Sequence, residues 1–499
     1  MLYKSTRNNN SQNKTSAQAI IQGIASDGGL FVPEKFPIFS ADKIASFVNM
    51  SYQTRAQVIM EKFLPDFSHT ALQNCILQAY SATTFDNPAI APLHRINEKV
   101  SILELWHGPT CAFKDIALQI LPHLLIESVH MEKSLFTTAI LVATSGDTGK
   151  AAMAGFKDIP LTKILVFYPH GGVSEVQKLQ MVTQSGNNVS VVAIDGNFDD
   201  TQNGVKEIFA NIKLKEVLAE NNICLSSANS INWGRLVPQI VYYFSAYADA
   251  VKNDSIKQGD AINFVVPTGN FGNILAGYYA KKMGLPIAKL ICAANENNVL
   301  TDFIHSGVYN RNRPFHKTIS PSMDILISSN LERLLFDLNG ENSDQIRAWM
   351  SELNDTGKYK INNNLVSSIQ DLFWSASSDD LATIKRIEQV YLVDNYLIDT
   401  HTAVAWNVYD LYVSETNDNT YTIIVSTASP FKFNESVAKA VLPAEELNVD
   451  SLTLLNTLSN STGEKIPAGL NNLGDKPILH HKIACKEKML AEVENFLLH

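Results

Sequence analysis

The sequence predicts an α/β fold of mostly parallel, twisted sheets, preceded by a mainly helical N-terminal segment. Residues 100–295 alternate short apolar runs with amphipathic helical stretches, which is typical of βαβ units. Runs such as "AINFVVP" (261–267) are apolar throughout, as expected of parallel strands that are buried on both faces. Residues 1–95 show helical spacing between breaks that contain proline.

The elements follow from this pattern in chain order. "TSAQAIIQGIA" (15–25) opens on Thr/Ser capping candidates, and "TALQNCILQAYSA" (70–82) places its apolar residues on one helix face. Pro122 marks a kink or an early stop in the next helix. The predicted strands are 100–106, 138–143, 163–169, 189–196, 261–267 and 289–295. The predicted helices are 112–128, 149–156, 174–186, 199–211, 234–252 and 273–284. Residues 330–395 carry many charges and are expected to form surface helices, and 421–433 to form a buried strand that ends in a polar turn.

Composition narrows the function classes. The net charge of −10 and pI near 5.7 argue against sequence-independent nucleic-acid binding, although a local basic pocket remains possible. The 5 cysteines are scattered without a CxxC pair, which fits a reduced compartment and excludes a compact zinc site. The N-terminus lacks a signal-peptide core, and no apolar run is long enough to span a membrane. We therefore expect a cytoplasmic protein without a metal.

The stretch "ATSGDTGKAA" (143–152) resembles a P-loop only superficially. A P-loop requires Gly, four residues, then Gly-Lys-Ser/Thr, whereas here a threonine stands at the first glycine position and Ala151 follows the lysine. A plain ATP-binding function is therefore disfavoured. Either the stretch is a polar turn after a strand, or Ser145, Asp147 and Thr148 converge at a helix start that binds an anion. Its lysine is expected to be solvated.

A second turn, in "VVPTGNFGNILAGYY" (265–279), joins an apolar strand directly to a helix. Its glycines permit close backbone approach, and the N–H groups at the helix start favour a phosphate. The alternative is a tight turn that needs glycine for geometry alone. The spacing is not GxGxxG, so it does not indicate a dinucleotide site.

Lys114 in "LELWHGPTCAFKDIALQ" (103–119) is the reactive-group candidate. It opens an apolar helix, where partial desolvation would lower its pKa and free a nucleophilic amine. Alternatively, it is a solvated lysine paired with Asp115. A reactive amine at one strand end and a phosphate cradle at another are the two anchors that pyridoxal phosphate needs, the amine binding the aldehyde.

At this point the chain resembles the threonine synthases, pyridoxal-phosphate enzymes of fold type II (tryptophan synthase β-like). The resemblance rests on motifs in the same order along nearly the whole chain. They are "YKSTR" (3–7), "IASDGGLFVPE" (24–34), "HGPTCAFKD" (107–115), "TSGDTG" (144–149), "SSANSINWGRL" (226–236), "PTGNFGN" (267–273), "PSMDI" (321–325), "SSNLERLL" (328–335), "DTHTAVA" (399–405) and "STASPFKF" (426–433).

The resemblance implies roles for individual residues. Lys114 would be the Schiff-base lysine and the proton-transferring base, with Phe113 beside the cofactor. Asp147 would lie near the ring hydroxyl, and Thr427 would face the pyridine nitrogen. The phosphate cradle would be Gly269, Asn270, Phe271, Gly272 and Asn273. The substrate carboxylate would bind at Ser145, Gly146 and Thr148, and the substrate phosphate at Asn229, Ser230, Asn232 and Arg235, with Lys432 as a further candidate.

The resemblance also implies a function: conversion of O-phospho-L-homoserine and water to L-threonine and phosphate, by a monomer or homodimer. The expected domains are an N-terminal domain (1–95), a large cofactor-binding domain (96–135 and 225–499) and a small mobile domain (136–224). Alternatives are another fold type II lyase such as threonine dehydratase, cysteine synthase, or a non-catalytic binding relative. Two positions depart from the family wording, since Ser429 and Thr400 replace the usual histidine and proline.

Overall fold

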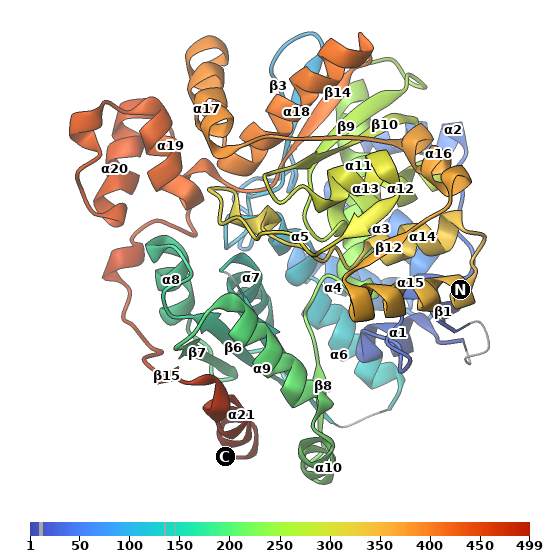
Figure 1. The fold of residues 1–499 in the computed structure, drawn as a ribbon, viewed down its shortest axis with the longest axis vertical. Coiled ribbons are helices and arrows are strands. Elements are labelled where there is room, and N and C mark those ends of the chain that lie inside the picture. Colours follow the sequence, from blue (N-terminus) through green and yellow to red (C-terminus); the bar gives the residue numbers. More distant parts are fainter. Residues whose placement is uncertain (9–12, 134–135, 145) are drawn as a thin grey trace.

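The protein is described here by a computed structural model that covers residues 1–8, 13–133, 136–144 and 146–499. Two mostly parallel sheets, each flanked by helices, lie side by side (Figure 1). The predicted α/β fold is thereby confirmed. None of the described helices is long and apolar enough to cross a membrane.

The larger sheet has six strands among the described residues, in the spatial order β13-β10-β9-β14-β4-β3. Neighbouring strands are parallel except for β3 and β4. The central strands β9 and β14 are buried at every position, which explains their continuous apolar sequence. The bounds are β3 Leu93–Arg95, β4 Val100–Glu104, β9 Ile262–Pro267, β10 Ile287–Ala294, β13 Phe373–Ser377 and β14 Thr422–Ser426.

The smaller sheet is parallel throughout, with the order β15-β7-β6-β5-β8 in the described part of the chain. Its bounds are β5 Thr137–Ala143, β6 Thr162–Pro169, β7 Val189–Ile194, β8 Ile223–Ser226 and β15 Ile483–Ala484. The helices that accompany it are α7 Asp147–Phe156, α8 Glu175–Val182, α9 Phe198–Ala210, α10 Ile212–Glu220 and α21 Met489–Leu498.

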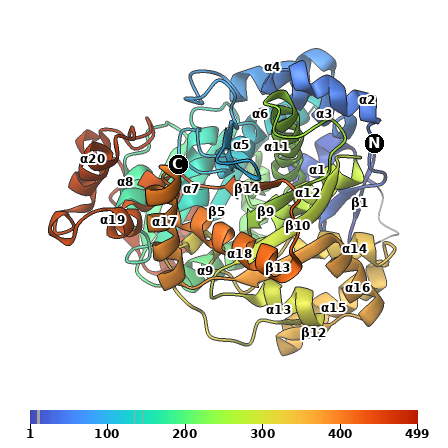
Figure 2. The same cartoon turned by 90° about the horizontal axis from the view of Figure 1, so that it is seen from above.

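Helices cover the two faces of the larger sheet, with the N-terminal helices on one side and α13 to α16 on the other, while α19 and α20 lie to one side of the sheet (Figure 2). The N-terminal segment contains β1 Tyr3–Ser5, α1 Ser16–Gln22, β2 Phe31–Pro33, α2 Ala41–Ser46, α3 Tyr52–Phe63 and α4 His69–Ala79. The helices of the central region are α5 Lys114–Leu118, α6 Leu121–Met131, α11 Trp233–Lys252, α12 Gly272–Lys282, α13 Val299–Ser306 and α14 Leu331–Leu338. The later elements are β11 Val308–Asn310, α15 Ser343–Thr356, β12 Lys358–Lys360, α16 Asn363–Leu372, α17 Asp380–Asp394, α18 Thr400–Thr416, α19 Asn434–Val441 and α20 Ser451–Thr462.

Two local predictions differ from the structure. The single helix predicted at 112–128 is two helices, α5 and α6. The helix is interrupted just before Pro122, which occupies the first turn of α6. The region 330–395, predicted to be helical, contains strand β13 at the edge of the larger sheet. Its short sequence "FWSAS" carries too little periodicity to stand out from the flanking helices.

The C-terminal end of the chain joins the smaller sheet. Strand β15 pairs in parallel with β7, and Ile483 lies opposite Ala193. The buried side chains Met489 and Val493 of α21 join the apolar core of the smaller sheet. Figure 1 shows the C-terminus beside this sheet. Burial of the apolar face of α21 stabilises this position, although α21 is far from the sheet's other elements along the chain.

Candidate active site

The expected site residues lie where parallel strands end. The loop after β4 leads to Lys114, the loop after β5 to Asp147, and the segments after β9 and β14 to the glycine turn and Thr427. The carboxyl ends of parallel strands share one edge of a sheet, where ligands of α/β proteins bind. Helices α5 and α7 approach closely at Gly155, where an added Cβ would lie 1.9 Å from the Leu118 carbonyl oxygen. This contact holds Lys114 and Asp147, at the starts of the two helices, near each other.

The Lys114 amine is buried and bonded to two side chains. Its Nζ donates to Asp147 Oδ2 at 3.0 Å and to Ser322 Oγ at 3.0 Å, and it lies 4.8 Å from the Phe113 ring centre. Burial lowers the pKa of the Lys114 amine, and the Asp147 carboxylate partly opposes this shift. The desolvated lysine expected from the sequence is therefore present, and its partner is Asp147, not Asp115.

Asp147 is the centre of a charged cluster. Its Oδ1 accepts from Gln177 Nε2 at 2.9 Å and lies 3.1 Å from Lys432 Nζ. Burial alone would raise the pKa of the Asp147 carboxyl, but the Lys114 and Lys432 ammonium groups hold it well below its usual range. Lys432 is completely enclosed, and its Nζ also donates to the Thr110 carbonyl at 2.7 Å. It thus lies beside Lys114 and Asp147.

Ser322 and His401 support this cluster and were given no role from the sequence. Ser322 Oγ donates to Asp147 Oδ2 at 2.8 Å, and its backbone N–H donates to His401 Nε2 at 3.1 Å. Because His401 Nε2 accepts, its Nδ1 carries the proton and donates to Asp399 Oδ2 at 2.6 Å. The motifs around Ser322 and His401 were recognised, but only the tertiary structure brings them together.

The turn at 269–273 has the features of an anion cradle. Phe271 adopts a left-handed backbone with φ of 61°, and an added Cβ on Gly269 would lie 2.9 Å from the Ser322 carbonyl oxygen. None of the backbone N–H groups from Gly269 to Asn273 donates to an acceptor among the described residues. The buried Asn273 Nδ2 also lacks a partner there, while Asn273 Oδ1 accepts from two tyrosine hydroxyls. These free donors at a helix start fit a phosphate group such as that of pyridoxal phosphate.

Ser322 links the two cofactor anchors. Its hydroxyl contacts the Lys114 amine, and its carbonyl lies against Gly269. The amine and the cradle are therefore within reach of one small molecule. Thr427 adjoins them, because its carbonyl accepts from the Phe113 N–H at 2.8 Å, and its buried hydroxyl has no hydrogen bond among the described residues.

The start of α7 presents a second, smaller set of free backbone N–H groups. Thr144 Oγ1 accepts from the N–H groups of Gly146 and Gly149, whereas those of Asp147 and Thr148 have no acceptor in the described ranges. Gly146 has φ of 132° and packs against Gln177. Ser145, predicted to bind the substrate carboxylate, lies outside the described residues. Two free N–H groups at the start of α7 fit a carboxylate.

The residues expected at the substrate phosphate differ in their availability. Arg235 is buried, and its Nη1 donates to the Ala228 carbonyl at 2.6 Å. Its Nε has no partner, and no carboxylate pairs with it in the described part of the chain. Burial lowers its pKa to about 10. Ser230 Oγ accepts from Asn330 Nδ2 at 3.2 Å, and Asn229 is exposed. The amide of Asn232 is already engaged, since it caps α11 and donates to the Ile20 carbonyl, so Asn232 has a structural role.

Helix α14 connects the cradle to the Asn229–Arg235 segment. The Asn330 N–H donates to the Asn270 carbonyl at 3.2 Å, and the fully buried Arg333 donates to the carbonyls of Ile231 and Phe31. Next to it, Glu332 accepts two hydrogen bonds from the guanidinium of Arg7, which lies in the turn after strand β1. The "YKSTR" and "SSNLERLL" motifs therefore form one scaffold behind both loops.

His107, in the turn before Lys114, is held between Asp86 and Glu104 at 2.7 Å from each. Burial by itself would lower the His107 pKa, but the two carboxylates raise it to about 9. The departures from the family wording are structural in this chain. The Ser429 hydroxyl accepts from the Phe431 N–H in the turn that carries Lys432, and Thr400 is buried at the start of α18.

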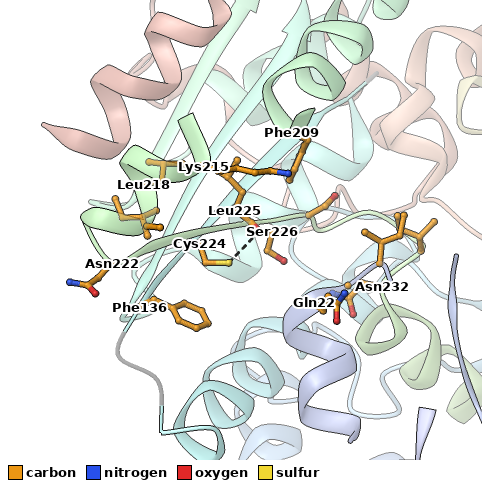
Figure 3. A pocket seen from close by; sticks show the side chains of 16 residues that line it. Gln22, Phe136, Phe209, Lys215, Leu218, Asn222, Cys224, Leu225, Ser226 and Asn232 are labelled. Atoms are coloured by element: carbon orange, nitrogen blue, oxygen red, sulfur yellow. Dashed lines mark hydrogen bonds between the residues drawn. The ribbon is translucent and has the colours of Figure 1, made fainter. Parts of the chain in front are cut away.

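A cavity of about 560 Å³ lies among the end of α1, helices α9 and α10 and strand β8 (Figure 3). Ile24, Phe209 and Leu225 contribute apolar walls, and Asn232 lines one side. Lys114 and Asp147 do not line it, so its size does not mark the chemical site. Among the described residues, no group of three or more His, Cys, Asp or Glu side chains could hold a metal ion.

The sequence was compared with models of protein families and with known proteins. Residues 2–80 match the family model "Threonine synthase N terminus", 84–359 "Pyridoxal-phosphate dependent enzyme" and 402–493 "Threonine synthase, C-terminal". The chain is 37% identical to the threonine synthase of Saccharomyces cerevisiae over 469 residues, covering 88% of this chain and 89% of that protein. It is 40% identical to human threonine synthase-like 1 over 461 residues, covering 90% of this chain and 60% of that longer protein.

Solved structures give the same result. The yeast threonine synthase superposes with a TM-score of 0.89 at 33% identity, covering 100% of this chain and 99% of that one. The pyridoxal-phosphate-bound threonine synthase of Brucella melitensis has a TM-score of 0.87 at 35% identity, covering 100% and 98%.

Proposed function

The chain belongs to the threonine synthase family of pyridoxal-phosphate-dependent enzymes, and we propose that it converts O-phospho-L-homoserine and water to L-threonine and phosphate. One observation supports this proposal: a buried amine, an amide-lined phosphate cradle and a buried guanidinium with no carboxylate partner among the described residues occur together. Ser322 contacts the first two, and Arg235 supplies the third. The third group matters because a second phosphate, on the substrate, needs its own cation.

The cofactor would be held by the backbone N–H groups and side chains that the site leaves available for it. The backbone of residues 269–273 would bind its phosphate, Lys114 its aldehyde carbon, and Thr427 its ring nitrogen, with Phe113 and Asp147 alongside. When bound, pyridoxal phosphate withdraws electrons from the substrate α-carbon and so stabilises negative charge there.

The protein groups then perform the remaining steps. The Lys114 amine takes the α-proton and later returns it, a role that suits a buried amine of lowered pKa beside that carbon. Arg235, with Asn229 and Ser230, would hold the substrate phosphate until it leaves the γ-carbon. One β-proton is lost before phosphate leaves, and the γ-carbon then takes up a proton to become the methyl group. Water adds its hydroxyl to the β-carbon and gives up its other proton. The free N–H groups of Asp147 and Thr148 would bind the substrate carboxylate, whereas the Gly146 N–H is already bonded to Thr144. Closure of the smaller sheet unit over the site would exclude bulk water.

The finer assignments belong to the same proposal. We place a small mobile domain at 136–224 together with the C-terminal residues that pair with it, between an N-terminal domain at 1–95 and the large domain. The protein would act as a monomer or homodimer in the cytoplasm, without nucleic-acid partners. The free state of all five cysteines supports a reducing compartment.

A direct assay tests the proposal. Purified protein supplied with pyridoxal phosphate is given O-phospho-L-homoserine, and phosphate and threonine are measured together. We expect equal amounts of both products, a yellow absorbance that borohydride bleaches, and loss of all three signals in Lys114→Ala. The exposed Lys178→Ala is the matched control.

The alternatives give different results in the same preparation. Ammonia from threonine, without phosphate release from O-phospho-L-homoserine, identifies a dehydratase. Sulfide incorporation into an activated serine identifies a cysteine synthase. Binding of cofactor and substrate without any turnover identifies a non-catalytic relative. Each of these outcomes would overturn the threonine synthase assignment.

A further inference from the structure

A second hollow, of about 220 Å³, lies one helical turn behind the Asp147 cluster. Lys150 of α7 and Gln180 of α8 line one side, and Gly469 and Lys476 of the C-terminal segment line the other. Its walls expose mostly polar atoms, unlike the apolar cavity of Figure 3. The volume is sufficient for a tetrahedral oxyanion with one or two waters, since each water occupies about 30 Å³.

The charges in this hollow are unbalanced. Neither Lys150 nor Lys476 forms an ion pair with a carboxylate in the part of the chain that the structure describes. Lys150 is half-buried, contrary to the solvated lysine expected from the sequence, and its Nζ donates to the neutral Gln184 amide. Burial, Lys476 and Lys432 lower its pKa to about 7, despite the nearby Asp115, whose oxygens already accept from Thr110.

The side-chain oxygen of Gln180, in the same hollow, needs a hydrogen-bond donor. Its side chain is 1% exposed, its Oε1 has no hydrogen-bond partner, and its Nε2 makes only a 3.5 Å contact with the Gly469 carbonyl. A buried acceptor without a donor destabilises the protein unless a bound group supplies the missing hydrogen bond. An ion that carries negative oxygens for the lysines and an O–H group for Gln180 would satisfy the whole hollow.

We propose that this hollow binds a hydrogen phosphate ion, at a site separate from the cofactor cradle and from Arg235. Hydrogen phosphate carries both the negative oxygens and the O–H donor, whereas sulfate carries no proton at neutral pH. The bound ion joins α7 and α8, which bear Asp147 and Gln177, to the C-terminal segment. Its binding is independent of the proposed function, which only makes phosphate available as a product.

The experiment measures binding of inorganic phosphate to the pyridoxal-phosphate-loaded protein by calorimetry, with sulfate as the competing ion. We expect saturable binding that weakens about tenfold or more in Lys150→Ala and in Lys476→Ala, because each change removes a charge-assisted hydrogen bond. Gln180→Leu should lose the preference for phosphate over sulfate. Lys178→Ala, on the same helix but outside the hollow, should bind phosphate like the unaltered protein.

Three outcomes would overturn the proposal. Phosphate affinity that is unchanged in both lysine variants excludes the hollow as the binding site. Equal affinity for sulfate and phosphate in the unaltered protein excludes the role of Gln180. A parallel rise in KM for O-phospho-L-homoserine and in the phosphate Kd shows that the hollow is the substrate's own phosphate position.

Two further controls keep the result interpretable. Lys476 is exposed, so Lys476→Ala tests the site even where Lys150→Ala does not fold. If the protein releases no phosphate from O-phospho-L-homoserine but binds inorganic phosphate as expected, the proposed function fails and this site stands.

Discussion

Replacement of Asp147 by asparagine removes the only carboxylate that pairs with Lys114 and Lys432 among the described residues, while it leaves the shape of the side chain unchanged. In the cofactor-free protein, two buried amines would then face a neutral amide. Breaking a buried pair in this way typically costs about 3–5 kcal/mol. The Ser322→Ala variant is the matched control, because Ser322 donates to the same Oδ2 atom but carries no charge.

The structure also sets the pH dependence of this loss. The Lys114 pKa is already lowered by burial, and removal of Asp147 removes the groups that oppose this shift. In the folded variant the Lys114 amine therefore loses its proton, so that no unpaired charge is buried at that position. At pH 7 this costs at most about 4–5 kcal/mol, given 1.36 kcal/mol per pKa unit and an unfolded lysine near 10.4. The cost falls as the pH rises toward the unfolded value.

Thermal melting of the cofactor-free protein measures both effects. We expect Asp147→Asn to lower Tm by about 3–5 °C at pH 7 and by clearly less at pH 9.5, using roughly 1 kcal/mol per degree for a chain of this length. Ser322→Ala should lose only about 1 kcal/mol, at either pH. Equal losses in the two variants at pH 7, or an Asp147→Asn loss that persists at pH 9.5, would refute the assignment of Asp147 as the counterion.

Three further predictions follow from the same structure. Gly269→Ala should weaken pyridoxal phosphate binding about tenfold or more in an absorbance titration, because the new Cβ meets backbone at 2.9 Å, whereas Gly171→Ala, with open space around it, should not. His107→Gln should lower Tm at pH 6 and have little effect above pH 9, since a raised pKa stabilises the fold below the unfolded value near 6.5 and this stabilisation is lost as the pH rises through about 9. A loss that grows with pH would contradict this. Arg333→Lys should cost about 2–4 kcal/mol of stability, because a lysine cannot reproduce the forked contacts to two backbone carbonyls. The same change should raise KM for the substrate. An unchanged KM would mean that α14 does not position the substrate loop.

Local sequence determined the elements that carry the chemistry. The continuous apolar runs of strands β9 and β14 are typical of parallel strands buried on both faces, and their alternation with helical stretches favoured that interpretation. Lys114 and the 269–273 turn were also identifiable, since a lysine among apolar neighbours and glycines between a strand and a helix each have few physical explanations. Together these two features indicated pyridoxal phosphate, and the order of the motifs along the chain indicated the family.

The tertiary structure decided which distant groups share these sites. Ser322, Gln177 and Lys432 gather around Asp147 from separate segments, and Lys150 faces Lys476 from the far end of the chain. No sequence pattern links such residues, because their spacing reflects how the strands and helices pack and not a repeat along the chain. For the same reason the two-residue strand β15 could not be recognised: its pairing with β7 and the burial of α21 exist only once the smaller sheet has formed.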